Sequence, residues 1–148
     1  TPDEIYHRPV NRFVAEFIGD PPLNVIACDV RRDGSMTAIS LPGGAMLHVA
    51  NCEIAVGPHW LGIRPHDVEL VDSGAPGAVA APLRFLENCG ARHVLHLEYG
   101  EYLLRVEVIP DMRSIGDLLY LRFPTDRVFL IDRIGERVIF LRRLEAAA

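Results

Sequence analysis

The chain has 148 residues, of which 49% are hydrophobic and 24% charged, and its 15 arginines and 20 acidic residues give a net charge of −5. This composition excludes a collagen-like, disordered or disulfide-scaffold protein. The acidic balance argues against a protein that binds nucleic acid through a basic surface. The length suits one domain or two small ones. The three cysteines have no Cys-x-x-Cys spacing, which indicates the reduced thiols of a cytoplasmic protein.

The first 22 residues predict a helical segment. Thr1 fits a helix N-cap, and Pro9 interrupts the helix because proline has no amide donor. A second short helix follows, with an apolar stripe whose members recur at a spacing of four and a glycine that caps its C-terminal end. The stripe and the glycine are Phe13, Val14, Phe17, Ile18 and Gly19. The stripe either packs on the following domain or docks a missing neighbour.

After residue 22 the pattern changes to short runs in which apolar and polar residues alternate, separated by glycine and proline turns. These runs predict strands at residues 24–30, 36–41, 45–49, 59–64, 67–71, 78–86, 92–99, 102–109, 119–123, 128–131 and 138–141. About ten short strands in this length favour one or two small Greek-key barrels of the OB type. We therefore predict a mainly β fold: a helical linker over 1–22, an OB-like domain over 23–144 and a tail over 145–148.

Motifs for catalysis and metal binding are missing from the sequence. Without any lysine, the chain cannot form a Walker phosphate loop, and it has neither a Gly-x-Ser-x-Gly nor a His-Glu-x-x-His motif. His93 and His96 fall in an alternating run, which sends them to opposite faces of a strand and argues against a shared metal. We expect no catalytic, cofactor or metal site in this chain.

One run, residues 62–67 (Gly-Ile-Arg-Pro-His-Asp), has two interpretations. Pro65 interrupts a pair of strands, and Arg64 and Asp67 bracket it. The simpler interpretation is a turn with a local ion pair, which contributes little stability when exposed. The functional interpretation is a contact point on the rim of a barrel, where loops carry recognition.

The N-terminal 19 residues closely resemble a segment of bacterial ABC-importer ATPase subunits, which serve the uptake of maltose-type sugars, glycerol-3-phosphate and polyamines. In that family the segment connects the nucleotide-binding domain to a C-terminal regulatory domain. Residues 61–67 resemble the Gly-Ile-Arg-Pro-Glu box of the family, with His66 in place of the usual glutamate. Residues 86–90 are similar to its Val-Glu-x-Leu-Gly element, and 126–132 to its closing strands.

The resemblance implies an OB-like (TOBE or MOP-like) regulatory domain that does not itself hydrolyse ATP. ATP and magnesium would bind in the ATPase domain, which is missing here. It further implies a cytoplasmic protein, peripheral at the inner face of the membrane, that serves sugar transport. The implied partners are the protein's own ATPase domain, a second ATPase subunit in a homodimer, permease subunits and a regulatory protein, with no nucleic acid. The implied domain or dimer contacts are Arg64, Pro65, His66, Asp67, Glu87 and Gly90, and the implied ATPase junction is Phe13, Phe17, Ile18 and Gly19.

Two other functions remain open at this point. Barrels of this kind also bind oxyanions such as molybdate, and ligand binding to the native state would then raise the thermal midpoint. An OB-type nucleic-acid module is the other alternative, and salt-dependent binding to single-stranded oligonucleotides would identify it.

Overall fold

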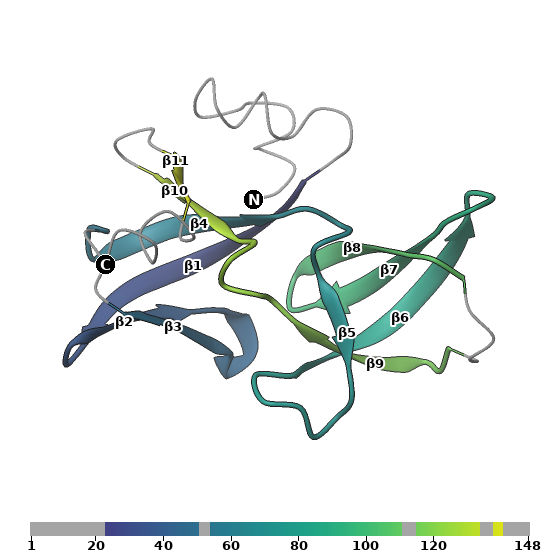
Figure 1. The fold of residues 1–148 in the computed structure, drawn as a ribbon, viewed down its shortest axis with the longest axis horizontal. Helices are drawn as coiled ribbons and strands as arrows, with labels where there is room; N and C mark the ends of the chain where they lie inside the picture. The colour runs from purple at the N-terminus through teal and green to yellow at the C-terminus, as the bar shows by residue number, and fades with distance from the viewer. Residues whose placement is uncertain (1–22, 51–53, 111–114, 134–137, 141–148) are drawn as a thin grey trace. The chain divides into compact units, whose positions relative to one another are not determined.

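A computed structural model describes residues 23–50, 54–110, 115–133 and 138–140 of the chain. Within these ranges the structure is almost entirely β, with eleven strands, β1 to β11, and a single 3₁₀ turn at Pro42–Gly44 (Figure 1). The mainly β, OB-like class predicted above is confirmed. The predicted helical linker over 1–22 lies outside the described residues. The chain divides into two compact units: unit 1 comprises Thr1–Arg64 and Thr125–Ala148, and unit 2 comprises Pro65–Pro124.

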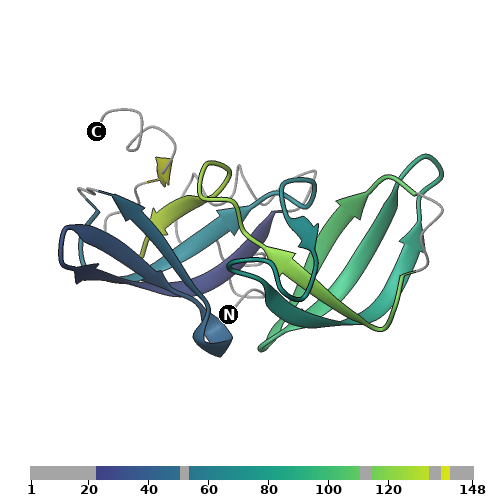
Figure 2. The ribbon, with the colours of Figure 1, turned by 60° about the horizontal axis from the view of Figure 1, so that its bottom comes forward.

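Unit 1 contains a curled antiparallel sheet in the order β11-β10-β4-β1-β2-β3 (Figures 1 and 2). Its strands are β1 (Asn24–Asp33), β2 (Met36–Ser40), β3 (Met46–Ala50), β4 (Gly57–Ile63), β10 (Phe129–Asp132) and β11 (Val138–Phe140). Strands β1 to β3 form a meander that begins with a hairpin at Gly34, whose φ of 63° suits glycine. Strand β4 then returns to pair with β1, which gives the 4-1-2-3 order of a Greek key.

Unit 2 repeats this topology with its own antiparallel sheet, in the order β5-β9-β6-β7-β8. Its strands are β5 (Glu69–Val71), β6 (Val79–Asn88), β7 (His93–Tyr99), β8 (Tyr102–Val108) and β9 (Leu118–Arg122). The meander β6-β7-β8 is followed by β9, which returns to pair with β6. Each unit is therefore a Greek key whose first strand is its longest, at 10 residues, and whose fourth strand carries one further neighbour.

The alternating pattern explains the two cores. In β7, Leu95, Leu97 and Tyr99 are buried on one face, where Leu104 and Val106 of the neighbouring β8 lie opposite them. Each such side chain contributes roughly 1.5–3 kcal/mol when it is removed from water. The corresponding core of unit 1 contains Ile26, Val30, Ile39, Leu61, Ile63 and Leu130. Among the described residues, no helix is long and apolar enough to span a membrane.

Candidate contact site on unit 2

The Gly-Ile-Arg-Pro-His-Asp run begins with the last two residues of β4 and continues into the link to β5, and its proline marks the start of unit 2. The main-chain amide of Glu107, on β8, donates a hydrogen bond of 2.9 Å to the carbonyl oxygen of Pro65. This bond attaches the run to the end of β8, although the two segments are about forty residues apart in the sequence. The position of His66 therefore depends on β8 as well as on the turn.

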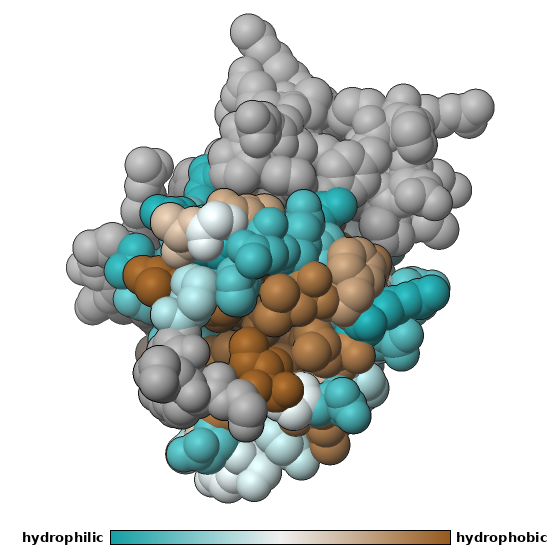
Figure 3. Space-filling view, turned by 90° about the vertical axis from the view of Figure 1, so that its right-hand side faces the viewer, coloured by the Kyte–Doolittle hydropathy of each residue, from teal (hydrophilic) through white to brown (hydrophobic). Residues whose placement is uncertain are grey.

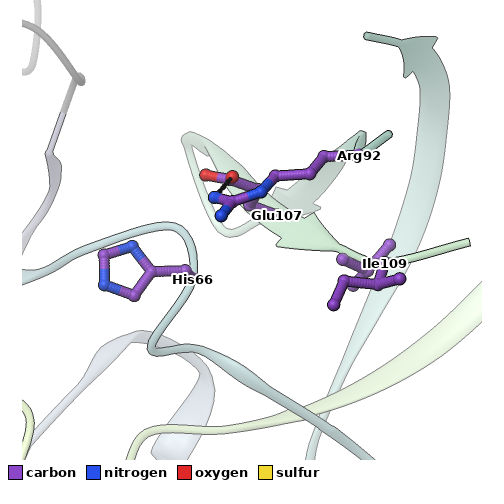
Figure 4. A pocket seen from close by; sticks show the side chains of 5 residues that line it. His66, Arg92, Glu107 and Ile109 are labelled. Carbon is purple, nitrogen blue, oxygen red and sulfur yellow. Dashed lines mark hydrogen bonds and ion pairs between the residues drawn. The ribbon is translucent and has the colours of Figure 1, made fainter. Parts of the chain in front are cut away.

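The attachment forms an open pocket of about 560 Å³ in unit 2. It is lined by His66, Arg92, Glu107, Val108 and Ile109. Arg92, at the start of the β7 hairpin, reaches across to Glu107, and its Nη1 donates to the Glu107 carboxylate (Figure 4). His66 comes from the loop before β5 and Ile109 directly follows β8, so three separate segments form the walls.

The polar groups of this pocket are charged but largely neutralised. Hydrogen bonding to Glu107, followed by the attraction of its charge, raises the pKa of Arg92. The Arg92 side chain is 63% exposed and that of Glu107 only 20%, so the guanidinium is the more accessible member of the pair. His66 Nε2 lies 3.7 Å from the carboxylate of Asp67. The pocket thus offers hydrogen-bond donors and an acceptor side by side, with little net charge.

A second polar group lies on the outer face of the β6–β7 hairpin. His96 is only 6% exposed, because the Phe85 ring stacks on it with the ring centroids 4.0 Å apart. Its Nε2 is 3.0 Å from Oε1 of Glu87, while its Nδ1 is buried without a hydrogen-bond partner. The hydrogen bond from His96 is the main cause that lowers the pKa of the Glu87 carboxyl.

The turn that follows Glu87 is held by short-range hydrogen bonds. The amide of Gly90 donates to Oδ1 of Asn88 at 3.0 Å, and the amide of Cys89 donates to the Arg92 carbonyl at 2.9 Å. Gly90 has a φ of 84°, a conformation that favours glycine. Replacing it would strain the turn that leads directly into Arg92, and therefore into the pocket.

Neither of the two described cysteines is an activated nucleophile. Burial raises the pKa of the Cys28 thiol to about 12. Cys89 is exposed, but desolvation and then the nearby Glu87 charge raise the pKa of its thiol. Reactive thiols need a lowered pKa. Within the part of the chain that the structure describes, no three His, Cys, Asp or Glu side chains form a group that could hold a metal ion.

The structure brings the two predicted contact segments into one unit. Pro65, His66 and Asp67 lie at or beside the pocket, and Glu87 and Gly90 lie in the hairpin that delivers Arg92 to it. Arg64 is the last residue before unit 2. The predicted junction residues Phe13, Phe17, Ile18 and Gly19 lie outside the described residues.

Sequence reasoning missed four residues of the pocket, namely Arg92, Glu107, Val108 and Ile109. The pairing of Arg92 with Glu107 depends on the register of β7 with β8, for which a single sequence carries no signal. The sequence carries a weak signal for Ile109, because this residue ends an alternating run and precedes a proline. The structure adds that its side chain is 79% exposed.

Unit 2 exposes several large apolar side chains. Figure 3 shows apolar side chains gathered in one area of the surface and bordered by polar ones. The large apolar residues that unit 2 exposes among its described residues are Leu70, Phe85, Leu86, Leu103, Ile109 and Leu118. Two of them, Phe85 and Leu86, directly precede Glu87. A continuous apolar area with a polar border is typical of an interaction surface.

Replacing Glu87 by glutamine is expected to lower the free energy of unfolding at neutral pH. Below the pKa of Glu87, the variant and the parent chain should have nearly the same free energy of unfolding. A carboxyl whose pKa is lower in the folded chain stabilises the fold above its unfolded pKa, and this contribution disappears as pH falls through the folded value. Urea unfolding at pH 7 and at pH 3 measures the difference.

The control for this prediction is His96→Phe, which keeps an aromatic ring against Phe85 but removes the Nε2 group. Glu87→Gln should have little further effect in the His96→Phe background, because the partner is already gone. Equal losses at both pH values, or full additivity of the two changes, would show that the His96–Glu87 contact does not set the pKa of Glu87.

The chain is similar in sequence to ATP-binding subunits of a bacterial importer. It is 36% identical over 142 residues to the sn-glycerol-3-phosphate import ATP-binding protein UgpC of Escherichia coli O6:K15:H31 (strain 536 / UPEC), across 93% of this chain and 39% of that protein. The UgpC proteins of Salmonella typhi and Escherichia coli O157:H7 match over the same lengths, at 36% and 35% identity. The chain thus spans about two fifths of the length of these relatives. No family model matches it.

Among solved structures, the cytoplasmic molybdate-binding protein ModG, with molybdate bound, has a similar fold. The TM-score is 0.55 and the sequence identity 15%, and the match covers 72% of this chain and 94% of the ModG chain. At this identity the likeness establishes the fold alone. It agrees with the OB-like architecture of the two units.

Proposed function

We propose that this chain, a C-terminal TOBE-like domain of the kind found in ABC-importer ATP-binding subunits, has two roles. It regulates such a subunit, and it stabilises the dimer of that subunit. The single observation that carries the proposal is the similarity to importer ATP-binding subunits along nearly the whole chain. In this proposal the chain does not hydrolyse ATP. The nucleotide and its magnesium ion bind in the remaining part of the subunit.

The contact site of unit 2 supports the role in domain or dimer contact. Two segments identified by resemblance, around His66 and around Glu87, lie far apart in the sequence but belong to the same unit. The bond from Glu107 to Pro65 fixes the first segment, and the bonds of the Gly90 turn fix the second. A rigid surface of this kind loses little conformational entropy on binding a partner.

The wider setting follows from the same relationship. The subunit would be cytoplasmic, held at the inner face of the membrane through permease subunits that its ATPase domain contacts. A sugar or a glycerol-phosphate compound is the proposed class of transported solute, because the relatives are named for sn-glycerol-3-phosphate import. A regulatory protein is proposed as a further partner.

The test uses the full-length subunit with Glu87→Ala or His66→Ala, compared with Glu101→Ala as a matched exposed position in the turn between β7 and β8. We expect the first two changes to weaken the dimer in light scattering, or to alter the permease-dependent ATPase rate, while the thermal midpoint stays within a few degrees. The Glu101 change should do neither. An unchanged dimer together with an unchanged ATPase rate would contradict the contact assignment.

A further inference from the structure

We propose that the pocket lined by His66, Arg92, Glu107, Val108 and Ile109 binds an aliphatic side chain and the adjacent main-chain amide of a partner protein's extended segment. The inference rests on the proposed function in one respect: it takes the partner to be the regulatory protein. It adds the place of contact and the chemistry that is recognised there.

The apolar part of the pocket calls for an aliphatic anchor. Val108 and Ile109 form this part, and Ile109 is 79% exposed although it directly follows the ordered strand β8. When a partner covers an aliphatic side chain at such a position, its removal from water contributes favourably to the free energy of binding. The volume of about 560 Å³ exceeds what one side chain needs, so the neighbouring main chain of the partner would also enter.

The polar part of the pocket matches a neutral amide better than a charged ligand. Arg92 uses Nη1 toward Glu107, and the guanidinium carries further N–H donors beside this contact (Figure 4). Glu107 supplies an acceptor next to them and cancels the charge of Arg92. A peptide group presents one acceptor and one donor, so it can use both partners without a net charge of its own. An isolated anion would meet the Glu107 carboxylate at the same place.

The walls of the pocket are held in place before a ligand arrives. His66 is positioned by the Glu107-to-Pro65 hydrogen bond and Arg92 by the turn bond from Cys89. The side chains of His66 and Arg92 are 51% and 63% exposed, so a segment on the surface of another protein can reach both. An open, preformed pocket of this kind suits a peptide segment, whereas small-molecule sites enclose most of their ligand.

The test is a titration of the ¹⁵N-labelled chain with N-acetyl-leucine-N′-methylamide, followed by amide chemical shifts. We expect saturable shifts at His66, Arg92, Val108 and Ile109. The affinity should be at least about tenfold weaker for N-acetyl-glycine-N′-methylamide, which lacks the aliphatic group. Ile109→Asp should weaken binding of the leucine probe similarly, and Arg92→Leu, which removes the donors, should do the same.

Leu103→Asp is the matched control, because Leu103 is an exposed aliphatic residue of the same unit outside the pocket. It should leave binding unchanged. The proposal is overturned by three results: no saturable shift, equal shifts with the glycine probe, or shifts at these residues caused by acetate or glycerol instead. If the pocket fails to bind the probe while the Glu87 variant still weakens the dimer, this inference falls and the proposed function stands. If the pocket binds the probe while the Glu87 variant leaves the dimer unchanged, the inference about ligand chemistry stands and the proposed contact function falls.

Discussion

Replacing Gly62 by alanine is expected to destabilise unit 1 by roughly 1–3 kcal/mol, the usual range for overpacking a filled core. Gly62 lies in β4 directly opposite Phe129 of β10. A Cβ atom at this position would lie 2.5 Å from Cε2 and 2.9 Å from Cζ of the Phe129 ring, and 3.1 Å from Cδ2 of Leu23. Because Phe129 and Leu23 are both buried, neither can simply turn into solvent to relieve the clash.

Chemical denaturation of the Gly62→Ala chain measures this effect. Gly74→Ala is the control, since a Cβ there meets nothing within 4 Å, and its stability should stay within about 0.5 kcal/mol of the parent. Phe129→Leu added to Gly62→Ala should recover part of the loss, because the smaller side chain frees the space that Cβ needs. If Gly62→Ala and Gly74→Ala were indistinguishable, the close packing of β4 against β10 would be wrong.

Local alternation in the sequence predicts the strands of this protein well. The alternating residues Leu95, Leu97, Leu104 and Val106 are all buried in unit 2, whereas Val108, at the end of the same run, is only half-buried. These predictions succeed because a half-buried strand needs only a period of two, which is visible in a few consecutive residues. The Asp-Gly turn that joins β1 to β2 is also a local feature, because this residue pair by itself favours a tight hairpin.

Features that depend on strand pairing could not be predicted in this way. Alternation places His96 on the outer face of β7, but it does not show that Phe85 and Glu87 of β6 cover it there. The same limit applies to the pairing of Arg92 with Glu107, because the two residues meet only after β7 and β8 adopt their register. Pairing between distant segments is set by the whole fold, and local sequence leaves it undetermined.

The division into two units depends on the most distant pairing of all. Strand β4 ends at Ile63 and its neighbour β10 begins at Phe129, so the whole of unit 2 is inserted between two adjacent strands of unit 1. The insertion begins at Pro65 and ends at Pro124. Its own ends are also close together, because β5 pairs with β9 from Glu69 opposite Arg122 onward.

Excision of residues 65–124, with an Asn-Gly turn in their place, is therefore expected to leave unit 1 folded. Strands β4 and β10 already lie antiparallel with Gly62 opposite Phe129, so Asn-Gly together with Thr125 and Asp126 would form a short hairpin loop between them. Hydrogen exchange should still show protection of Ile26, Leu61 and Leu130, which are fully buried in the unit 1 core. A control excision of residues 34–50, which removes β2 and β3 from the sheet itself, should abolish that protection.

The same excision in the full-length subunit tests whether the contact function belongs to unit 2 as a whole. It removes the whole pocket together with Glu87 and Gly90, and it retains every residue of unit 1. If the contact function belongs to unit 2, the subunit should still hydrolyse ATP but lose the dimer stabilisation and regulation that depend on this domain. Loss of protection throughout unit 1 would show instead that the two units fold as one, and a regulated ATPase without residues 65–124 would place the contact function elsewhere in the chain.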